Sequence, residues 1–177
     1  RMFDVTSQSG GLAVQLVYFR GIGECRASGW VGEPARLTGL MRRIACEGGQ
    51  TQIARVLRHI RDAAKTVPVR AFGYVGDAME EDVDALAALA GELGLRGIRG
   101  FVFQEGHDPE ASSGFATIAR LTGGAHARFD VNAPASLLDL LRGAAAYAAG
   151  GREAMLRLAG STPAVKGLIA AMDGGRR

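Results

Sequence analysis

Asp77 is the residue best placed to do chemistry, because it comes directly after an apolar stretch that predicts a buried parallel strand. That stretch runs from Val69 to Val75, with alternating and then continuous apolar residues, and Gly76 ends it. Ligands of open α/β sheets bind outside the carboxyl ends of the strands, so Asp77 is expected on a ligand-binding rim. A carboxylate at this position can hold a cation, or it can turn the chain or cap the next helix.

A second polar cluster follows the next predicted strand, where Glu105, His107 and Asp108 lie close together in the sequence. It can form a site on the same rim, or it can be a loop in which Asp108 caps a helix that begins at Pro109.

Enzyme motifs elsewhere are incomplete. The Gly21-Ile22-Gly23 turn resembles a dinucleotide fingerprint, but Arg26 takes the place of the third glycine and a strand is predicted to follow. No glycine-rich turn ends in the Gly-Lys-Ser/Thr of a phosphate-binding loop, and Ser112-Ser113 lacks the G-x-S-x-G pattern.

The two cysteines, Cys25 and Cys46, have no spacing typical of a metal site or a disulfide framework, and they are expected to be thiols of a reducing compartment. A nucleophile pair with His59 is conceivable, but His59 is expected in mid-helix among arginines, exposed to solvent.

The composition predicts one compact α/β globule. The chain has 177 residues, of which 47% are hydrophobic, and it contains 21 basic and 18 acidic residues scattered along its length. Without a basic run interleaved with aromatic residues, nucleic acid is not an expected partner. No apolar stretch reaches the ~20 residues of a membrane span and no signal peptide is evident, so a cytoplasmic and bacterial setting is expected.

Hydrophobic periodicity predicts strands that alternate with helices, and therefore a mostly parallel central sheet with helices on both faces. The tight turn at Gly21 to Gly23 predicts a hairpin, and hence one antiparallel edge strand. The expected strands are residues 12–19, 25–31, 69–75, 98–104 and 125–129, and the expected helices are residues 34–44, 51–65, 80–93, 109–121, 135–149 and 153–158.

Three segments, in the same order, resemble motifs of von Willebrand factor A-type (VWA) domains, which have a Rossmann-like fold. They are the loop EGGQTQI at 47–53, the strand end FGYVGD at 72–77, and the segment IARLTGGAHARF at 118–129. The resemblance covers about Leu12 to Tyr147. It implies a single domain over residues 1–160, followed by a helical and basic tail over residues 161–177.

The resemblance also implies a metal-ion-dependent adhesion site, in which a magnesium ion on the rim binds an acidic group of a protein partner. Thr51 would take the threonine position and Asp77 the aspartate position. Each residue could instead cap a helix. The family's Asp and two Ser from a D-x-S-x-S motif are missing after a first strand, so Mg²⁺ binding by this chain is expected to be weak or absent.

The sequence departs from the family at its amino end. The stretch Asp4 to Ser9 is similar to D-x-S-x-S but lies too close to Leu12, and it is interpreted as the end of a first helix. Position 1 is Arg, so the first strand and its motif are expected upstream in a longer protein. Gly76 also stands where the family has a small hydroxyl residue, and Ala78 where it has Gly.

The predicted function is a non-catalytic protein-binding module. Two alternatives stay open: an α/β enzyme that uses a metal or a nucleotide at the same rim, and a scaffold without a metal.

Overall fold

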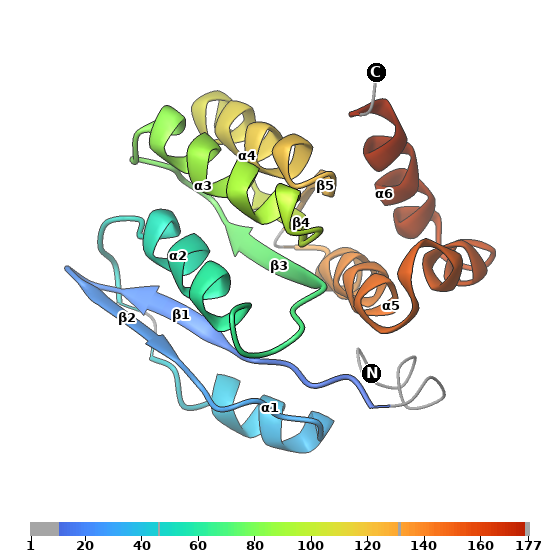
Figure 1. Ribbon diagram of the computed structural model, residues 1–177, viewed down its shortest axis with the longest axis horizontal. Coiled ribbons are helices and arrows are strands. Elements are labelled where there is room, and N and C mark those ends of the chain that lie inside the picture. The colour runs from blue at the N-terminus through green and yellow to red at the C-terminus, as the bar shows by residue number, and fades with distance from the viewer. Residues whose placement is uncertain (1–10, 46, 131, 176–177) are drawn as a thin grey trace.

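The computed structural model describes residues 11–45, 47–130 and 132–175. Its centre is a three-stranded parallel sheet in the order β3-β4-β5, and a separate antiparallel hairpin lies beside it (Figure 1). The strands of the sheet are β3 (Ala71–Gly76), β4 (Arg99–Glu105) and β5 (Ala125–Phe129), and those of the hairpin are β1 (Val17–Arg20) and β2 (Glu24–Ala27).

Helices cover both faces of the parallel sheet. One apolar cluster joins the sheet to α2, α3 and α4, and another joins its opposite face to α5 and α6. The helices are α1 (Pro34–Met41), α2 (Ile53–Ala63), α3 (Val83–Leu95), α4 (Pro109–Leu121), α5 (Pro134–Ala159) and α6 (Pro163–Gly174). The predicted α/β class is confirmed, as are a mostly parallel sheet with helices on both faces and the antiparallel pairing of β1 with β2. In the described part of the chain, this pair forms a sheet of its own, whereas the sequence predicted one antiparallel edge strand.

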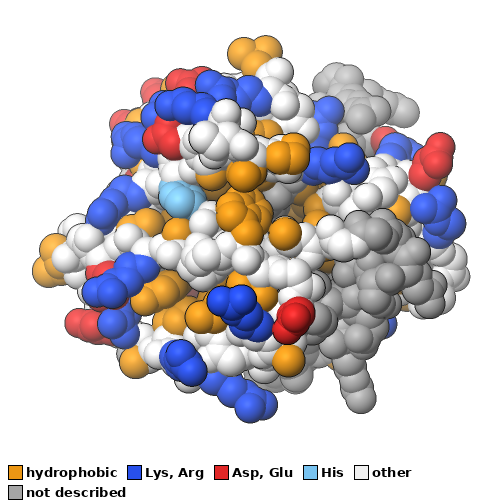
Figure 2. All heavy atoms as spheres, turned by 60° about the horizontal axis from the view of Figure 1, so that its bottom comes forward, with side chains coloured by type: hydrophobic (Ala, Val, Ile, Leu, Met, Phe, Trp, Pro, Cys, Tyr) orange, Lys and Arg blue, Asp and Glu red, His pale blue; other side chains and the backbone are white. Residues whose placement is uncertain are grey.

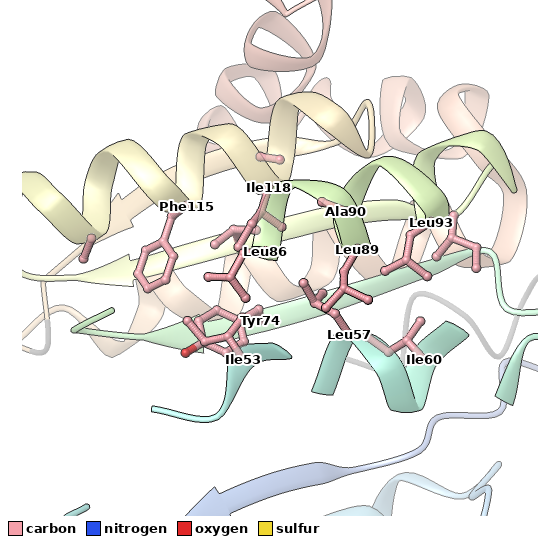
Figure 3. Packing of buried hydrophobic residues seen from close by; sticks show 14 residues of the cluster. Ile53, Leu57, Ile60, Tyr74, Leu86, Leu89, Ala90, Leu93, Phe115 and Ile118 are labelled. Carbon is pink, nitrogen blue, oxygen red and sulfur yellow. The ribbon is translucent and has the colours of Figure 1, made fainter. Parts of the chain in front are cut away.

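Strand β4 is buried on both faces, which explains its continuous apolar sequence. Val102 points into the cluster with α2, α3 and α4, whereas its neighbours Phe101 and Phe103 point into the cluster with α5 and α6. All three side chains are fully buried. Figure 3 shows the first cluster, in which Leu57 of α2 and Tyr74 of β3 meet the inner faces of α3 and α4.

The Thr-Gly-Gly motif that follows α4 is explained by close packing. The Thr122 hydroxyl accepts a hydrogen bond from the Gly100 amide at 3.1 Å and donates to the Ile118 carbonyl oxygen at 2.8 Å. Gly124 lies so close to Gly100 that a Cβ atom would overlap with the Gly100 carbonyl group. The motif therefore joins the end of α4 to β4, and it does not depend on a ligand.

The predicted strand at residues 12–19 is shorter in the structure, because a side chain interrupts its pairing. The Ser28 hydroxyl accepts a hydrogen bond from the Leu16 amide at 3.0 Å, in the place of a main-chain carbonyl. Beyond this point, only an isolated bridge between Val14 and Val31 continues the pairing. The same interruption ends β2 at Ala27, where the sequence predicted a strand through Val31.

The carboxyl-terminal part is helical, as predicted, and has a joint at Gly150 and Gly151. Both residues have non-helical backbone angles, so α5 consists of two helical segments. The helical part of the predicted tail is α6, whose residues Val165, Leu168 and Met172 are buried in the cluster with α5. Among the described residues, no helix has the length and apolar character needed to cross a membrane.

Candidate functional site

The loop before α2 and the loop between β3 and α3 are joined by two reciprocal hydrogen bonds. The Thr51 amide donates to a carboxylate oxygen of Glu80 at 3.1 Å, and the Glu80 amide donates to the Thr51 hydroxyl at 3.1 Å. Thr51 is therefore held at the carboxyl end of β3, against the loop that begins with Asp77. The predicted pairing of these two segments on one rim agrees with this geometry.

Glu81 strengthens the same connection by capping α2. Its carboxylate accepts hydrogen bonds from the Ala54 amide at 2.9 Å and from the Ile53 amide. Charged hydrogen bonds to the free amides of a first helical turn are among the stronger polar contacts. The side chains of Glu80 and Glu81 thus fix the loop that presents Asp77.

Neither candidate ligand caps a helix. The α2 helix begins at Ile53 and its N-cap residue is Gln52, so Thr51 lies one residue before the cap. The α3 helix begins at Val83, three residues later than predicted, and Asp82 caps it by accepting from the Ala85 amide at 2.8 Å. The capping alternative is therefore wrong for Asp77 and for Thr51.

Asp77 is exposed at the end of β3, beside the buried ring of Tyr74. Burial, and to a smaller extent the carboxylates of Glu81 and Asp77, raises the pKa of the Tyr74 hydroxyl. A Cβ atom on Gly76 would lie 2.7 Å from that hydroxyl oxygen and 2.8 Å from the ring carbon Cε1. Tyr74 thus explains why glycine stands where the resembling family has a hydroxyl residue.

Restoring that hydroxyl residue is expected to destabilise the rim. We predict that Gly76→Ser lowers the free energy of unfolding by about 1–2 kcal/mol, because the new Cβ meets the Tyr74 ring. The double variant with Tyr74→Leu should recover most of the loss. Urea unfolding of both variants measures this, and a serine variant as stable as the parent would contradict the packing account.

The Thr51 hydroxyl has a measurable structural role of its own. Thr51→Val keeps the shape but removes the acceptor of the Glu80 amide, and it should cost about 1 kcal/mol. Thr51→Ser keeps the hydroxyl and should stay within about 0.5 kcal/mol of the parent. Thermal unfolding compares the three proteins, and equal losses for valine and serine would mean that this hydrogen bond contributes nothing.

The same loop is also anchored to α4. Met79 packs into the apolar cluster with α2, α3 and α4, and its thioether lies over Gly114 in the second turn of α4. No Cβ fits at Gly114 without moving the Met79 side chain. Asp77 therefore projects from a loop that two neighbouring helices hold in place.

The β1-β2 turn completes this side of the rim. Gly49 lies directly against the Gly21 backbone, leaving no room for a Cβ. Arg20 donates to Glu24 at 2.9 Å and to the Ala45 carbonyl oxygen at 3.2 Å, which ties the end of β1 to the loop before α2. The GGQT segment is thus explained by backbone packing at Gly49 and by the Thr51 hydrogen bonds.

In the second polar cluster, after β4, Asp108 caps a helix and His107 makes an exposed contact. Asp108 caps α4 by accepting from the Ala111 amide at 2.7 Å, as predicted. His107 is exposed, with its Nδ1 atom 3.3 Å from Arg128 Nη1. Buried Gln104 contacts His126 at 3.2 Å, and burial, with Arg128 as a smaller cause, lowers the pKa of His126.

His59 has a structural contact that disfavours its pairing with a cysteine as a nucleophile. His59 is half-buried rather than exposed, and its Nε2 atom lies 2.8 Å from the Gln15 side-chain oxygen, where it ties α2 to the segment before β1. Burial raises the pKa of the Cys25 thiol, with a smaller opposing effect of Arg55, which disfavours the reactive thiolate. Cys46 and the Asp4 to Ser9 segment lie outside the described residues.

The rim has donors suited to a hard cation, but few of them are available. Asp77 offers one carboxylate and Thr51 one hydroxyl oxygen, which also accepts the Glu80 amide, whereas the carboxylates of Glu80 and Glu81 are directed at amides of the loop before α2 and of its first turn. In the described part of the chain, no three His, Cys, Asp or Glu side chains group in a way that could hold a metal ion. Magnesium takes six oxygen ligands, so these residues form an incomplete site.

Sequence reasoning missed the part played by Glu80 and Glu81. Their hydrogen bonds join residues 27 to 29 positions apart in the sequence, and local sequence patterns do not predict contacts over such a separation. The available signal was weak: two consecutive glutamates between the end of a predicted strand and a good helix cap, Asp82.

Comparison with models of protein families gives no match, and comparison with curated proteins gives none either. Among solved structures, the chain is similar to one described as the SpRpn10 VWA domain. The TM-score is 0.57 with 10% sequence identity, and the alignment covers 73% of this chain and 71% of that chain. Together with the sheet, its flanking helices and the hairpin, this likeness shows that the chain has a von Willebrand factor A-like fold.

Proposed function

We propose that this chain is a non-catalytic protein-binding module that recognises its partner at the rim formed by Thr51, Asp77 and their loops. The observation that carries the proposal is the fixed presentation of an exposed carboxylate. Asp77 projects to solvent from a loop that Glu80 and Glu81 attach to α2 and that Met79 attaches to α4. A preformed, exposed polar group lowers the entropic cost of binding.

In this proposal, Thr51 and Asp77 hold a divalent ion such as Mg²⁺ weakly, and an acidic side chain of the partner completes its ligand shell. Water fills the remaining positions. The acidic character of the partner and a cytoplasmic setting belong to the same proposal.

Acidic caps argue against a nucleotide-binding enzyme at this rim. The carboxylates of Glu81, Asp82 and Asp108 accept hydrogen bonds from the first turns of α2, α3 and α4. Phosphate groups bind at helix amino termini through such amides, and a carboxylate that already accepts from one or two of them at each terminus repels a phosphate there. One open apolar hollow, of about 470 Å³, lies away from this rim, between α6 and the second segment of α5.

Selection from a phage-displayed library of random dodecapeptides tests the proposal. Selection is done on the whole chain with Mg²⁺, after removal of phage that bind the Asp77→Ala variant. We expect peptides that contain Asp or Glu and lose binding in EDTA. Selected peptides that bind equally well in EDTA, or no enrichment at all, would contradict rim recognition through an ion.

A further inference from the structure

The outer face of α6 has the composition of a contact surface. Lys166 and Asp173 are the charged residues of this helix, and every other residue in it is apolar or glycine. Its inner stripe packs into the cluster with α5, but Ala170 and Ala171 are exposed on the other side. A surface helix normally carries polar residues on its outward face, and a helix that is apolar all round is normally buried. The outer face of α6 is therefore suited to being covered.

The hollow of about 470 Å³ lies beside this face, between α6 and the second segment of α5. The two segments run in opposite directions, because a short connection joins them at one end and Arg152 donates a hydrogen bond to Asp173 at the other. The lining is mostly apolar and consists of Leu156, Ala159, Gly160, Lys166, Ile169, Ala170 and Asp173. Leu156 is 48% exposed. An open hollow of this kind suits a neighbouring helix better than a small molecule, which binds in an enclosing pocket.

The charges of the hollow are arranged symmetrically about its middle. Lys166 and Asp173 are seven positions apart on α6, which is about 10 Å or two helical turns, and Ile169 and Ala170 lie midway between them. All four residues line the hollow, so they share one face of the helix. Among the described residues, Lys166 has no ion-pair partner. The face thus offers a positive charge at one end, a negative charge at the other, and small or apolar groups at the centre.

We propose that this face is the interface of a homodimer, in which α6 of one copy lies antiparallel to α6 of the other, beside its hollow. A two-fold axis near Ile169 and Ala170 brings Lys166 of each copy opposite Asp173 of the other, so the same ion pair forms twice. Alanine at the centre lets the two helices approach closely. Burial of Leu156 and of the apolar lining supplies the favourable free energy.

The arrangement of the hollow selects this occupant over an extended segment of another protein. Two helices line it, and helices offer no unpaired backbone groups along their length for a strand to bond with. A helix, which satisfies its own backbone groups, is the element that fits. Charges of opposite sign at equal distances from the centre match the same charges on a second, antiparallel copy.

The face that carries the hairpin lacks this self-complementarity. Hydrophobic side chains gather in its middle, with Lys and Arg around them (Figure 2). Arg36 of α1, and Arg42 and Arg43 directly after it, are all exposed. Two copies that met through this face would bring like charges together, which costs free energy. Of these two faces, the one formed by α6 is therefore the one suited to self-association.

The dimer leaves the rim of each copy free. Figure 1 shows α6 on the opposite side of the molecule from the hairpin turn and from the loops that precede α2 and α3. Two rims on one dimer would bind a partner with two recognition segments more tightly than a single rim does, through a higher effective concentration.

Sedimentation velocity of the unmodified chain tests the dimer. We expect the sedimentation coefficient to rise from the monomer value to the dimer value between about 1 and 100 µM. Lys166→Glu and Asp173→Lys each place like charges opposite one another at both ion pairs, so each should weaken dimerisation about tenfold or more. An equimolar mixture of the two variants restores attraction at both pairs, and it should form dimers as the parent does.

Arg58→Glu is the matched control, because it makes the same change of charge at an exposed position on α2 and should dimerise like the parent. Thermal unfolding checks that all variants are folded. Three results would overturn the proposal: a chain that stays monomeric throughout, single variants that dimerise like the parent, or a mixture that stays monomeric. The experiment is done in EDTA, so its outcome does not depend on the function proposed for the rim.

Discussion

Replacing Glu81 by alanine is expected to lower the free energy of unfolding by about 2–3 kcal/mol, the largest polar effect on this rim. The carboxylate accepts hydrogen bonds from the Ile53 and Ala54 amides, and alanine leaves those amides without a partner. The negative charge of the carboxylate also interacts favourably with the positive, amino-terminal end of the α2 dipole. Urea unfolding measures the loss.

Glu81→Gln is the matched control, because its amide oxygen accepts one hydrogen bond without the charge. It should recover about half of the loss. If Glu81→Ala is as stable as the parent, the carboxylate does not cap α2, and the claim that the Asp77 loop is fixed to that helix fails.

Replacing Gly124 by alanine is expected to cost about 3 kcal/mol or more. A Cβ atom at this position overlaps with the carbonyl group of Gly100, which is backbone inside the sheet and cannot rotate away. Relief requires β5 to move away from β4, and β4 is the most buried of the described strands. Thermal unfolding measures the effect.

Gly91→Ala serves as its control. Gly91 lies inside α3, and apart from its chain neighbours and the backbone of its own helix, nothing lies within 4 Å of where its Cβ would be. Alanine at a helical glycine should raise stability by about 0.5–1 kcal/mol. Similar losses at both positions would mean that the effect at Gly124 does not come from contact with Gly100.

Much of the fold was predictable from periodicity and caps. The α4 helix and β5 have the predicted bounds, because Asp108 with Pro109 and the Thr-Gly-Gly segment mark the two ends of that helix clearly. The hairpin strands were predicted too long, because the Ser28 side chain replaces a main-chain acceptor. Such a substitution within a ladder leaves no trace in hydrophobic patterning.

The candidate site was predictable in part. Strand ends and the family resemblance identified Thr51 and Asp77, and the structure holds Thr51 against the loop that Asp77 begins. The contacts that hold that loop were not predictable, since Glu80 and Glu81 bond to backbone groups far away in the sequence. The sequence shows that Gly76 departs from the family's pattern, but it does not show the cause, which is the close contact with the neighbouring Tyr74 ring.

The most direct test of the rim is paramagnetic broadening of amide NMR signals by Mn²⁺, which takes oxygen ligands as Mg²⁺ does. The chain and its Asp77→Ala variant are titrated side by side. We predict selective broadening of the amides of Thr51 and of Asp77 to Glu81 in the parent, and its loss in Asp77→Ala. No local broadening, or the same pattern in both proteins, would contradict an ion site at Thr51 and Asp77.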